Sequence, residues 1–110
     1  AMGKVLLAHS DAGTVSRIAR RKLPGYTANT ITDGPTLRRE LDTVLEKGYA
    51  VDREEITRGL VCVAAPVFGA DGELAAAISC TISSFDASPE RLEELAAMVT
   101  RSAAVASGQD

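Results

Sequence analysis

Apolar and polar residues recur along the chain with two different periods, which separates helical from extended segments. Residues 2–8 are nearly all apolar and predict a short helix. A second helix is expected to run to about Arg21, because apolar side chains recur at helical spacing behind Ser10 or Asp11, either of which can cap it. The Leu-Pro-Gly run at 23–25 then breaks the helical pattern. The first quarter of the chain therefore predicts two helices in succession.

Two later helices are marked by residues that begin or end them. Asp33 and Pro35 are typical of a helix start, and Gly48 of a helix end. The helix between them has apolar positions at Leu37, Leu41, Val44 and Leu45. Ser88 and Pro89 likewise predict the start of the last helix. Its apolar face is formed by Leu92, Leu95, Ala96, Val99 and Ala103.

The segment between these helices has the period of β-structure. Alternation after residue 48 predicts a half-buried strand that carries Tyr49, Val51 and Ile56. Residues 60–68 are nearly all apolar and predict a central strand, whose end is marked by Pro66 and a Gly-Ala-Asp-Gly turn. Residues 73–82 are its expected antiparallel partner. The order of elements predicts an α+β domain with helices packed on an antiparallel sheet. About three strands are fewer than an independent sheet usually has, so we expect further strands from an upstream region or from another copy.

Size and charge narrow the function classes. A chain of 110 residues with 45% hydrophobic and 25% charged residues is typical of one globular domain. Its net charge of −3 argues against a whole-domain attraction to nucleic acid. No apolar run approaches the roughly 18 residues that cross a bilayer, and residues 1–10 lack a signal-peptide core. We therefore expect a cytoplasmic protein that does not bind membranes.

The cysteines and the histidine offer little for catalysis. Cys62 and Cys80 lie in apolar strands, which favours reduced, buried thiols, with a Cys62–Cys80 disulfide as the less favoured alternative. Cys62 and His9 would be a minimal nucleophile and base for a cysteine-dependent hydrolase. Apolar neighbours disfavour the reactive thiolate of Cys62, however, and His9 is more typical of a helix end. We therefore predict no catalytic residue.

Polar residues on the strands point more readily to a binding pocket. Asp52 follows the apolar Val51 at the end of its strand, and the next strand is expected to bring Cys62 close to it. Glu54 and Glu55 are expected to form a solvated edge. Ser79 and Thr81 share one face of their strand by the period-2 rule. The run from Asp52 to Glu55 has no calcium-loop pattern, so neither a metal site nor a cofactor is predicted.

Several motifs together resemble a known family. They are GKVLLA at the start, LPGYTANTITD, GYAVDREE followed by GLVCVAAPVF, ELAAAIS, and SPERLEELAAMV. They are similar to the effector-binding domain of the IclR-type bacterial transcriptional regulators. The resemblance implies a GAF- or profilin-like fold, a curved antiparallel sheet flanked by helices, here truncated at its N-terminal side. Residues 1–106 would form the C-terminal part of that domain, and 107–110 a disordered tail.

The resemblance also implies a function. Such a domain senses a small organic acid, aliphatic or aromatic, and modulates DNA binding by an N-terminal winged helix-turn-helix that this chain lacks. A homodimer or homotetramer is implied as well. The implied effector-binding residues are Ala1, Met2, Gly3, Asp52, Cys62, Ser79 and Thr81.

The start of the first helix would hold the carboxylate of the acid, and the strand residues would meet the other end of the effector. An ionised Asp52 repels a carboxylate, so it would face a hydroxyl or take up a proton. The hydrolase described above and a pure oligomerisation module are the alternatives.

Overall fold

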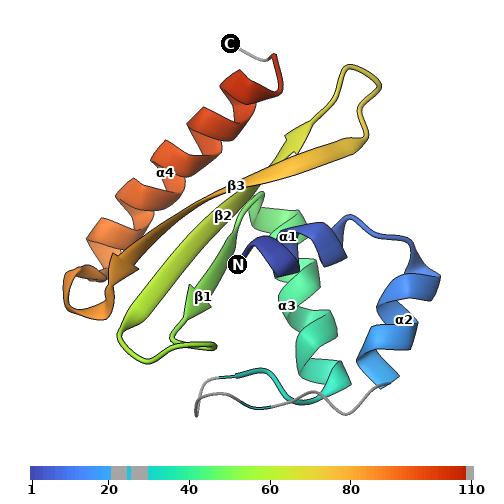
Figure 1. Cartoon of the computed structure of the whole chain (residues 1–110), viewed down its shortest axis with the longest axis horizontal. Helices are drawn as coiled ribbons and strands as arrows, with labels where there is room; N and C mark the ends of the chain where they lie inside the picture. Colours follow the sequence, from blue (N-terminus) through green and yellow to red (C-terminus); the bar gives the residue numbers. More distant parts are fainter. Residues whose placement is uncertain (21–24, 26–29, 109–110) are drawn as a thin grey trace.

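An antiparallel sheet separates one long helix from the helices of the N-terminal half in the computed structural model, which describes residues 1–20, 25 and 30–108 (Figure 1). The helices are α1 (Met2–Ala8), α2 (Ala12–Arg20), α3 (Gly34–Lys47) and α4 (Pro89–Ala106). The strands are β1 (Ala50–Arg53), β2 (Leu60–Phe68) and β3 (Leu74–Ser83), and a 3-10 turn spans Ser84–Asp86. The α+β prediction is confirmed.

The strand β2 lies at the centre of the sheet, as its apolar sequence predicts. Within the described residues the order is β1-β2-β3, with both pairs antiparallel. Val63 and Ala64 are both fully buried although they point to opposite faces, because a helix covers each face at this point. Pro66 does not mark the strand end as predicted: it pairs with Ala77 inside β2. The strand ends after Phe68, where the turn at 69–72 reverses the chain.

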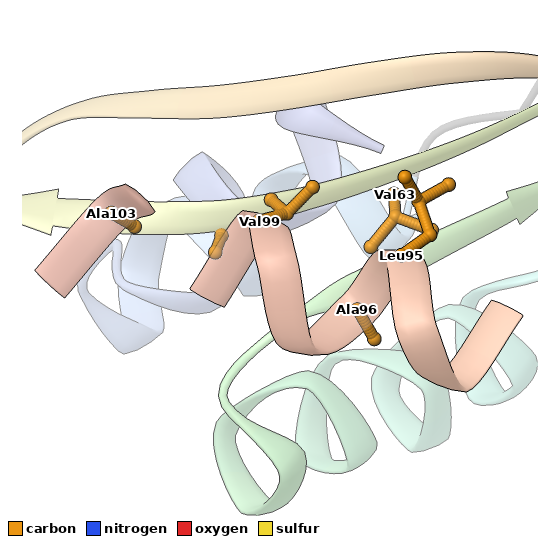
Figure 2. Close-up of a cluster of buried hydrophobic side chains, with 6 residues drawn as sticks. Val63, Leu95, Ala96, Val99 and Ala103 are labelled. Carbon is orange, nitrogen blue, oxygen red and sulfur yellow. The ribbon is translucent and has the colours of Figure 1, made fainter. Parts of the chain in front are cut away.

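The helix α4 packs on one face of the sheet and forms a purely apolar core there (Figure 2). This core consists of Val63, Ala65, Leu95, Ala96, Val99 and Ala103, and Leu92 packs at its margin. The predicted apolar face of the last helix is therefore confirmed. Alanine at three of the six core positions allows the helix to lie close to the strands.

The opposite face of the sheet is covered by α1, and α3 packs behind α1 (Figure 1). A second apolar cluster joins Val5 of α1 and Val44 of α3 to Ala50 and Ala64 of the sheet. The helix α2 packs outside α3 and has no fully buried side chain. The N-terminal half is therefore held to the sheet by few large apolar side chains.

Side chains cap the helices where the sequence predicts. An Asp33 carboxylate oxygen accepts a hydrogen bond from the Thr36 N–H at 2.9 Å, and an Asp11 oxygen accepts one from the Thr14 N–H at 2.7 Å. These backbone hydrogen bonds lower the pKa of both carboxyl groups. Gly48 ends α3 with a φ of 83°, a backbone conformation that favours glycine.

Two expectations about individual residues were wrong. Ile56 lies beyond the end of β1 and is 58% exposed, whereas Leu45 belongs to α3 as predicted, with 53% of its surface exposed. Ser107, expected in a frayed tail, accepts a hydrogen bond from the Phe68 N–H at 2.9 Å and so joins the end of α4 to β2. The predicted break at 23–25 and the last two residues of the tail lie outside the described residues, except for Gly25.

Candidate functional site

Three polar side chains from three strands lie in one row across the sheet. Cys62 of β2 is the register partner of Asp52 on one side and of Thr81 on the other. Side chains of paired strand residues lie on the same face, so all three project toward α1 and away from α4. The expectation that the sheet brings Asp52 to Cys62 is confirmed. The same alternation places Cys80 in the α4 core, which separates the two free thiols by the thickness of the sheet.

This row forms the floor of a cavity of about 200 Å³ at one end of the sheet. The residues that line it are Ala1, Asp52, Ile56, Thr57, Leu60, Cys62 and Thr81. Four of the seven predicted effector-binding residues are therefore brought together: Ala1, Asp52, Cys62 and Thr81. Met2, Gly3 and Ser79 are exposed and stand outside this lining. Because Thr81, Ile56 and Leu60 are also exposed, the cavity opens to solvent.

Asp52 is held by the backbone around it. One of its oxygens, Oδ1, accepts a hydrogen bond from the Glu55 N–H at 2.7 Å. The other, Oδ2, lies 3.9 Å from the nitrogen of Ala1, and the side chain is only 13% exposed. The carboxylate therefore stands between the turn that follows β1 and the start of α1. It has one oxygen tied to the protein and one directed toward the helix start that lines the cavity.

The turn after β1, residues 54–59, supplies the outer wall of the cavity. Glu54 has a φ of 59°, a left-handed conformation that non-glycine residues rarely adopt. Its Oε1 accepts a hydrogen bond from the Gly59 N–H at 2.8 Å, and its own N–H bonds to the Leu60 carbonyl. These bonds close the turn and place Ile56 and Thr57 over the floor of the cavity.

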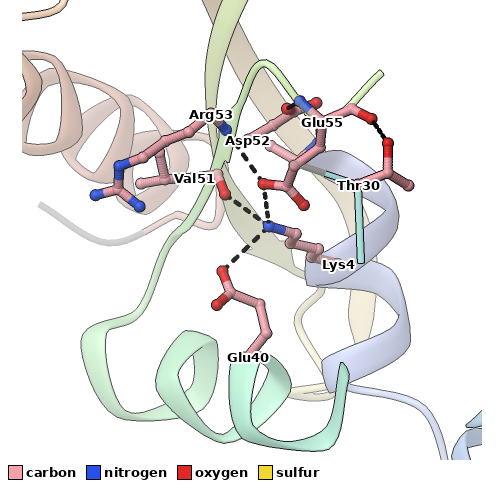
Figure 3. Close-up of polar contacts among 8 residues, drawn as sticks. Lys4, Thr30, Glu40, Val51, Asp52, Arg53 and Glu55 are labelled. Carbon is pink, nitrogen blue, oxygen red and sulfur yellow. Dashed lines mark hydrogen bonds and ion pairs between the residues drawn. The ribbon is translucent and has the colours of Figure 1, made fainter. Parts of the chain in front are cut away.

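A partly buried ammonium group on α1, that of Lys4, was missed by the sequence analysis (Figure 3). The Nζ of Lys4 donates to Glu55 Oε2 at 2.7 Å, to the Val51 carbonyl at 2.7 Å and to Glu40 Oε1 at 3.1 Å. The side chains of Lys4 and Glu55 are only 12% and 14% exposed. Glu54 and Glu55 are therefore not the solvated edge that we predicted. A single lysine inside the apolar helix at 2–8 was the signal that could have indicated this contact.

The geometry disfavours the alternative in which Cys62 and His9 form a catalytic pair. The ring of His9 packs edge-on against that of Phe68, with centroids 5.3 Å apart, at the far end of β2. Cys62 lies six positions earlier on the strand, roughly 20 Å away at the usual rise of an extended chain. A nucleophile and its base must be within hydrogen-bond reach. The described residues therefore hold no Cys-His pair.

A larger hollow of about 460 Å³ lies between α3, β1 and the start of α4. Its lining includes Lys47, Arg53 and Glu93, exposed side chains of both charges on its rim. The smaller cavity is the better candidate, because its polar groups converge from paired strands and Asp52 among them is fixed by a hydrogen bond. No group of side chains suited to hold a metal ion is present among the described residues. No described helix is long and apolar enough to cross a membrane.

The fold and the cavity define a class: a small α+β domain that presents polar strand residues to a ligand-sized cavity beneath a helix start. The family described as "Bacterial transcriptional regulator IclR C-terminal" matches residues 1–107. The chain belongs to this family, and the resemblance inferred from the motifs is confirmed.

Individual relatives agree with this assignment. The HTH-type transcriptional regulator KdgR of Escherichia coli is 40% identical over 99% of this chain and 42% of its own length. The crystal structure of its C-terminal domain superposes with a TM-score of 0.83 at 38% identity, covering 98% of this chain and 68% of that one. The inducer-binding domain of PobR from Acinetobacter, solved as a double mutant with 3-hydroxybenzoic acid, gives a TM-score of 0.83 at 31% identity, over 94% of this chain and 60% of that one. The chain spans between 29% and 42% of the length of these curated relatives.

Proposed function

We propose that this chain is the effector-sensing domain of an IclR-type regulator and that its effector is a small hydroxy acid. The observation that carries the proposal is the row of Asp52, Cys62 and Thr81 on the floor of a cavity that also contacts the start of α1. Hydroxyl, thiol and carboxylate groups in one row can recognise a ligand by hydrogen bonds. At about 200 Å³ the cavity is smaller than the roughly 300–1,000 Å³ of drug-sized sites, which favours a small ligand.

The charges around the cavity restrict how an acid can enter it. Asp52, Glu40 and Glu55 bring three carboxylates to this region, and the nearby ammonium of Lys4 already has three acceptors. A carboxylate placed against Asp52 would be repelled. The end of the effector that meets Asp52 is therefore a donor such as a hydroxyl. Its carboxylate lies toward the first N–H groups of α1, which have no partner within the helix.

The relatives support an acid that carries a hydroxyl. The PobR domain named above was crystallised with 3-hydroxybenzoic acid, which has a carboxylate at one end and a hydroxyl at the other. We take an aromatic or aliphatic hydroxy acid as the effector class.

The proposed output is regulation of DNA binding. The relatives are named HTH-type regulators, and this chain corresponds to only part of them. In the complete protein the effector would act on an N-terminal winged helix-turn-helix through unequal affinity for two conformations or assemblies. We propose a cytoplasmic homodimer or homotetramer without enzymatic activity. Neither the hydrolase nor a pure oligomerisation module is favoured by a specific observation on the described residues.

A matched pair of ligands tests the proposal. Calorimetric titration with 3-hydroxybenzoate, benzoate, and short aliphatic acids with and without a hydroxyl should reveal saturable binding by at least one hydroxy acid. Loss of its hydroxyl should weaken binding about tenfold, the value of one lost hydrogen bond in a partly buried site. If no acid of the panel binds saturably, the proposal fails.

Variants of β3 locate the binding. Thr81→Val removes a hydroxyl from the cavity, and Ser79→Ala removes one from the same face of the same strand outside the lining. We expect Thr81→Val to weaken the hydroxy acid about tenfold and Ser79→Ala to have little effect. Equal losses would mean that the site extends along β3 beyond this cavity, as the sequence analysis predicted for Ser79.

A further inference from the structure

The ammonium of Lys4 joins parts of the molecule that are distant in the sequence. Its three acceptors belong to α3, to β1 and to the turn at 54–59 (Figure 3). An ammonium group has three protons, so this set of acceptors uses its donor capacity in full. Lys4 is therefore not available to bind a ligand directly. Its position in α1, close to Ala1, nevertheless places it beside the wall of the cavity.

Glu55 is held through its carboxylate Oε2, its carbonyl and its N–H. Its Oε2 accepts from Lys4 and also from the Arg53 N–H at 3.1 Å. Its carbonyl accepts a hydrogen bond from the Thr30 hydroxyl, and its N–H donates to Asp52 Oδ1 at 2.7 Å. A continuous series of contacts thus leads from the Lys4 ammonium through Glu55 to the carboxylate of Asp52.

We infer that Lys4 is a positioning residue for the cavity: by holding Glu55 it fixes the orientation of the Asp52 carboxylate. The inference rests on the proposed function, because it assigns Lys4 a role in the proposed effector site. The Glu55 N–H occupies Oδ1, which leaves Oδ2 as the oxygen directed toward the start of α1. Lys4 thereby determines which acceptor the effector meets, although it does not line the cavity.

The turn needs such a constraint for two reasons. Glu54 is in the left-handed region, which is unfavourable for a side chain with a Cβ atom and persists only where surrounding contacts maintain it. The carboxylates of Glu40 and Glu55 also share one ammonium group. Without Lys4 they would repel each other at partly buried positions. Loss of Lys4 should therefore release the turn while the α4 core remains intact.

Amide hydrogen exchange of the full 110-residue chain tests this without any ligand. In Lys4→Met, which preserves much of the side-chain volume, exchange at the Glu55 N–H should be about tenfold faster. Exchange at the Val63 N–H, in the core of the sheet, should be unchanged. Lys4→Arg keeps the charge and should restore Glu55 exchange to within about threefold of the wild-type rate.

Two carboxylate variants serve as matched partners. Glu55→Gln weakens the contact that leads to Asp52, and Glu40→Gln weakens the contact of the same ammonium with α3. We expect faster Glu55 exchange in Glu55→Gln and a nearly unchanged rate in Glu40→Gln. Unchanged Glu55 exchange in both Lys4→Met and Glu55→Gln would overturn the inference. Equal acceleration at Glu55 and Val63 in both variants would also overturn it, because it would mean general destabilisation.

A titration with 3-hydroxybenzoate separates this inference from the proposed function. If the wild-type chain binds it, Lys4→Met should weaken binding about tenfold and Glu40→Gln should leave it within about twofold. Equal affinity of wild type and Lys4→Met would overturn the positioning role even if exchange at Glu55 rises. If 3-hydroxybenzoate does not bind the wild type, the choice of effector fails, and the exchange rates decide for or against the Lys4 inference on their own.

Discussion

The two faces of the sheet are built on different principles. Between α4 and the sheet the core is entirely apolar, with Val63, Leu95 and Val99 buried against one another (Figure 2). Between α1 and the sheet the apolar cluster is smaller, and one end of the face carries Asp52, Cys62 and Thr81. In an apolar core, close packing limits the volume of each side chain. In a polar site, each buried polar group needs a hydrogen-bond partner.

This difference assigns a separate role to each face. The α4 face contributes hydrophobic stabilisation in proportion to buried apolar area. On the α1 face, hydrogen bonds hold Asp52 and Glu55 in fixed positions beside a cavity. Substitutions on the first face should therefore change stability, and substitutions on the second should change local structure and binding.

The largest effect is expected on the α4 face. Leu95 is 2% exposed, so Leu95→Ala should lower the free energy of unfolding by about 2–5 kcal/mol, from lost burial and the cavity left behind. Met98, on the same helix, is 57% exposed, and Met98→Ala should cost no more than about 0.5 kcal/mol. Urea unfolding followed by circular dichroism measures both. Similar values for the two variants would contradict the view that this face holds the principal core.

The apolar face was predictable because its information is local. The spacing of Leu95, Val99 and Ala103 and the run at 60–68 indicate helix and strand without knowledge of their neighbours. The row of Asp52, Cys62 and Thr81 was predictable in part, since the alternation of strand residues determines the face of each. Their assignment to one effector-binding pocket came from the resemblance of the motifs to the family.

The contacts of Lys4 could not be derived in the same way. The ammonium group meets Glu40, Val51 and Glu55, which lie 36 to 51 positions away in the sequence. Charged residues such as Glu55 are usually exposed, so the pattern alone favours solvent. Only the packing of α1 against α3, β1 and the turn that follows β1 brings an acceptor to each proton of the ammonium. Strand alternation predicts the face on which Ser79 lies, but not how far along β3 the cavity extends. Ser79 is exposed and lies outside the cavity lining.

A double-mutant cycle makes the comparison quantitative on the polar face. The coupling energy of Lys4→Met with Glu55→Gln should be about 1 kcal/mol, because the pair is partly buried and short. With Glu40→Gln it should be smaller, since that carboxylate is 30% exposed and its contact with Lys4 is longer, at 3.1 Å. Urea unfolding of the single and double variants gives both values. A larger coupling to Glu40 would mean that Lys4 acts mainly to attach α1 to α3.

The smallest effect concerns the helix that supports the polar face. The Thr36 N–H at the start of α3 lowers the pKa of Asp33 below its ordinary value of 3.8. Because the folded-state pKa is the lower one, this contribution to stability is complete above pH 3.8 and is lost as the pH falls through the folded-state value. Asp33→Asn retains a capping oxygen that does not titrate, so this part of the acid-induced loss should be absent.

Asp42→Asn is the matched control for that variant, because it removes an exposed carboxylate from the middle of the same helix, away from the cap. Urea midpoints measured at neutral pH and below pH 3.8 provide the test. From neutral to acidic pH, the urea midpoint should fall less in Asp33→Asn than in the wild type. In Asp42→Asn it should fall by nearly as much as in the wild type.

Since Val44 of α3 packs against Val5 of α1, loosening of α3 in acid should reach the α1 face of the sheet before the α4 core. If amide hydrogens of the α4 core exchanged in acid before those of the α1 face, the separation of the two faces would be contradicted.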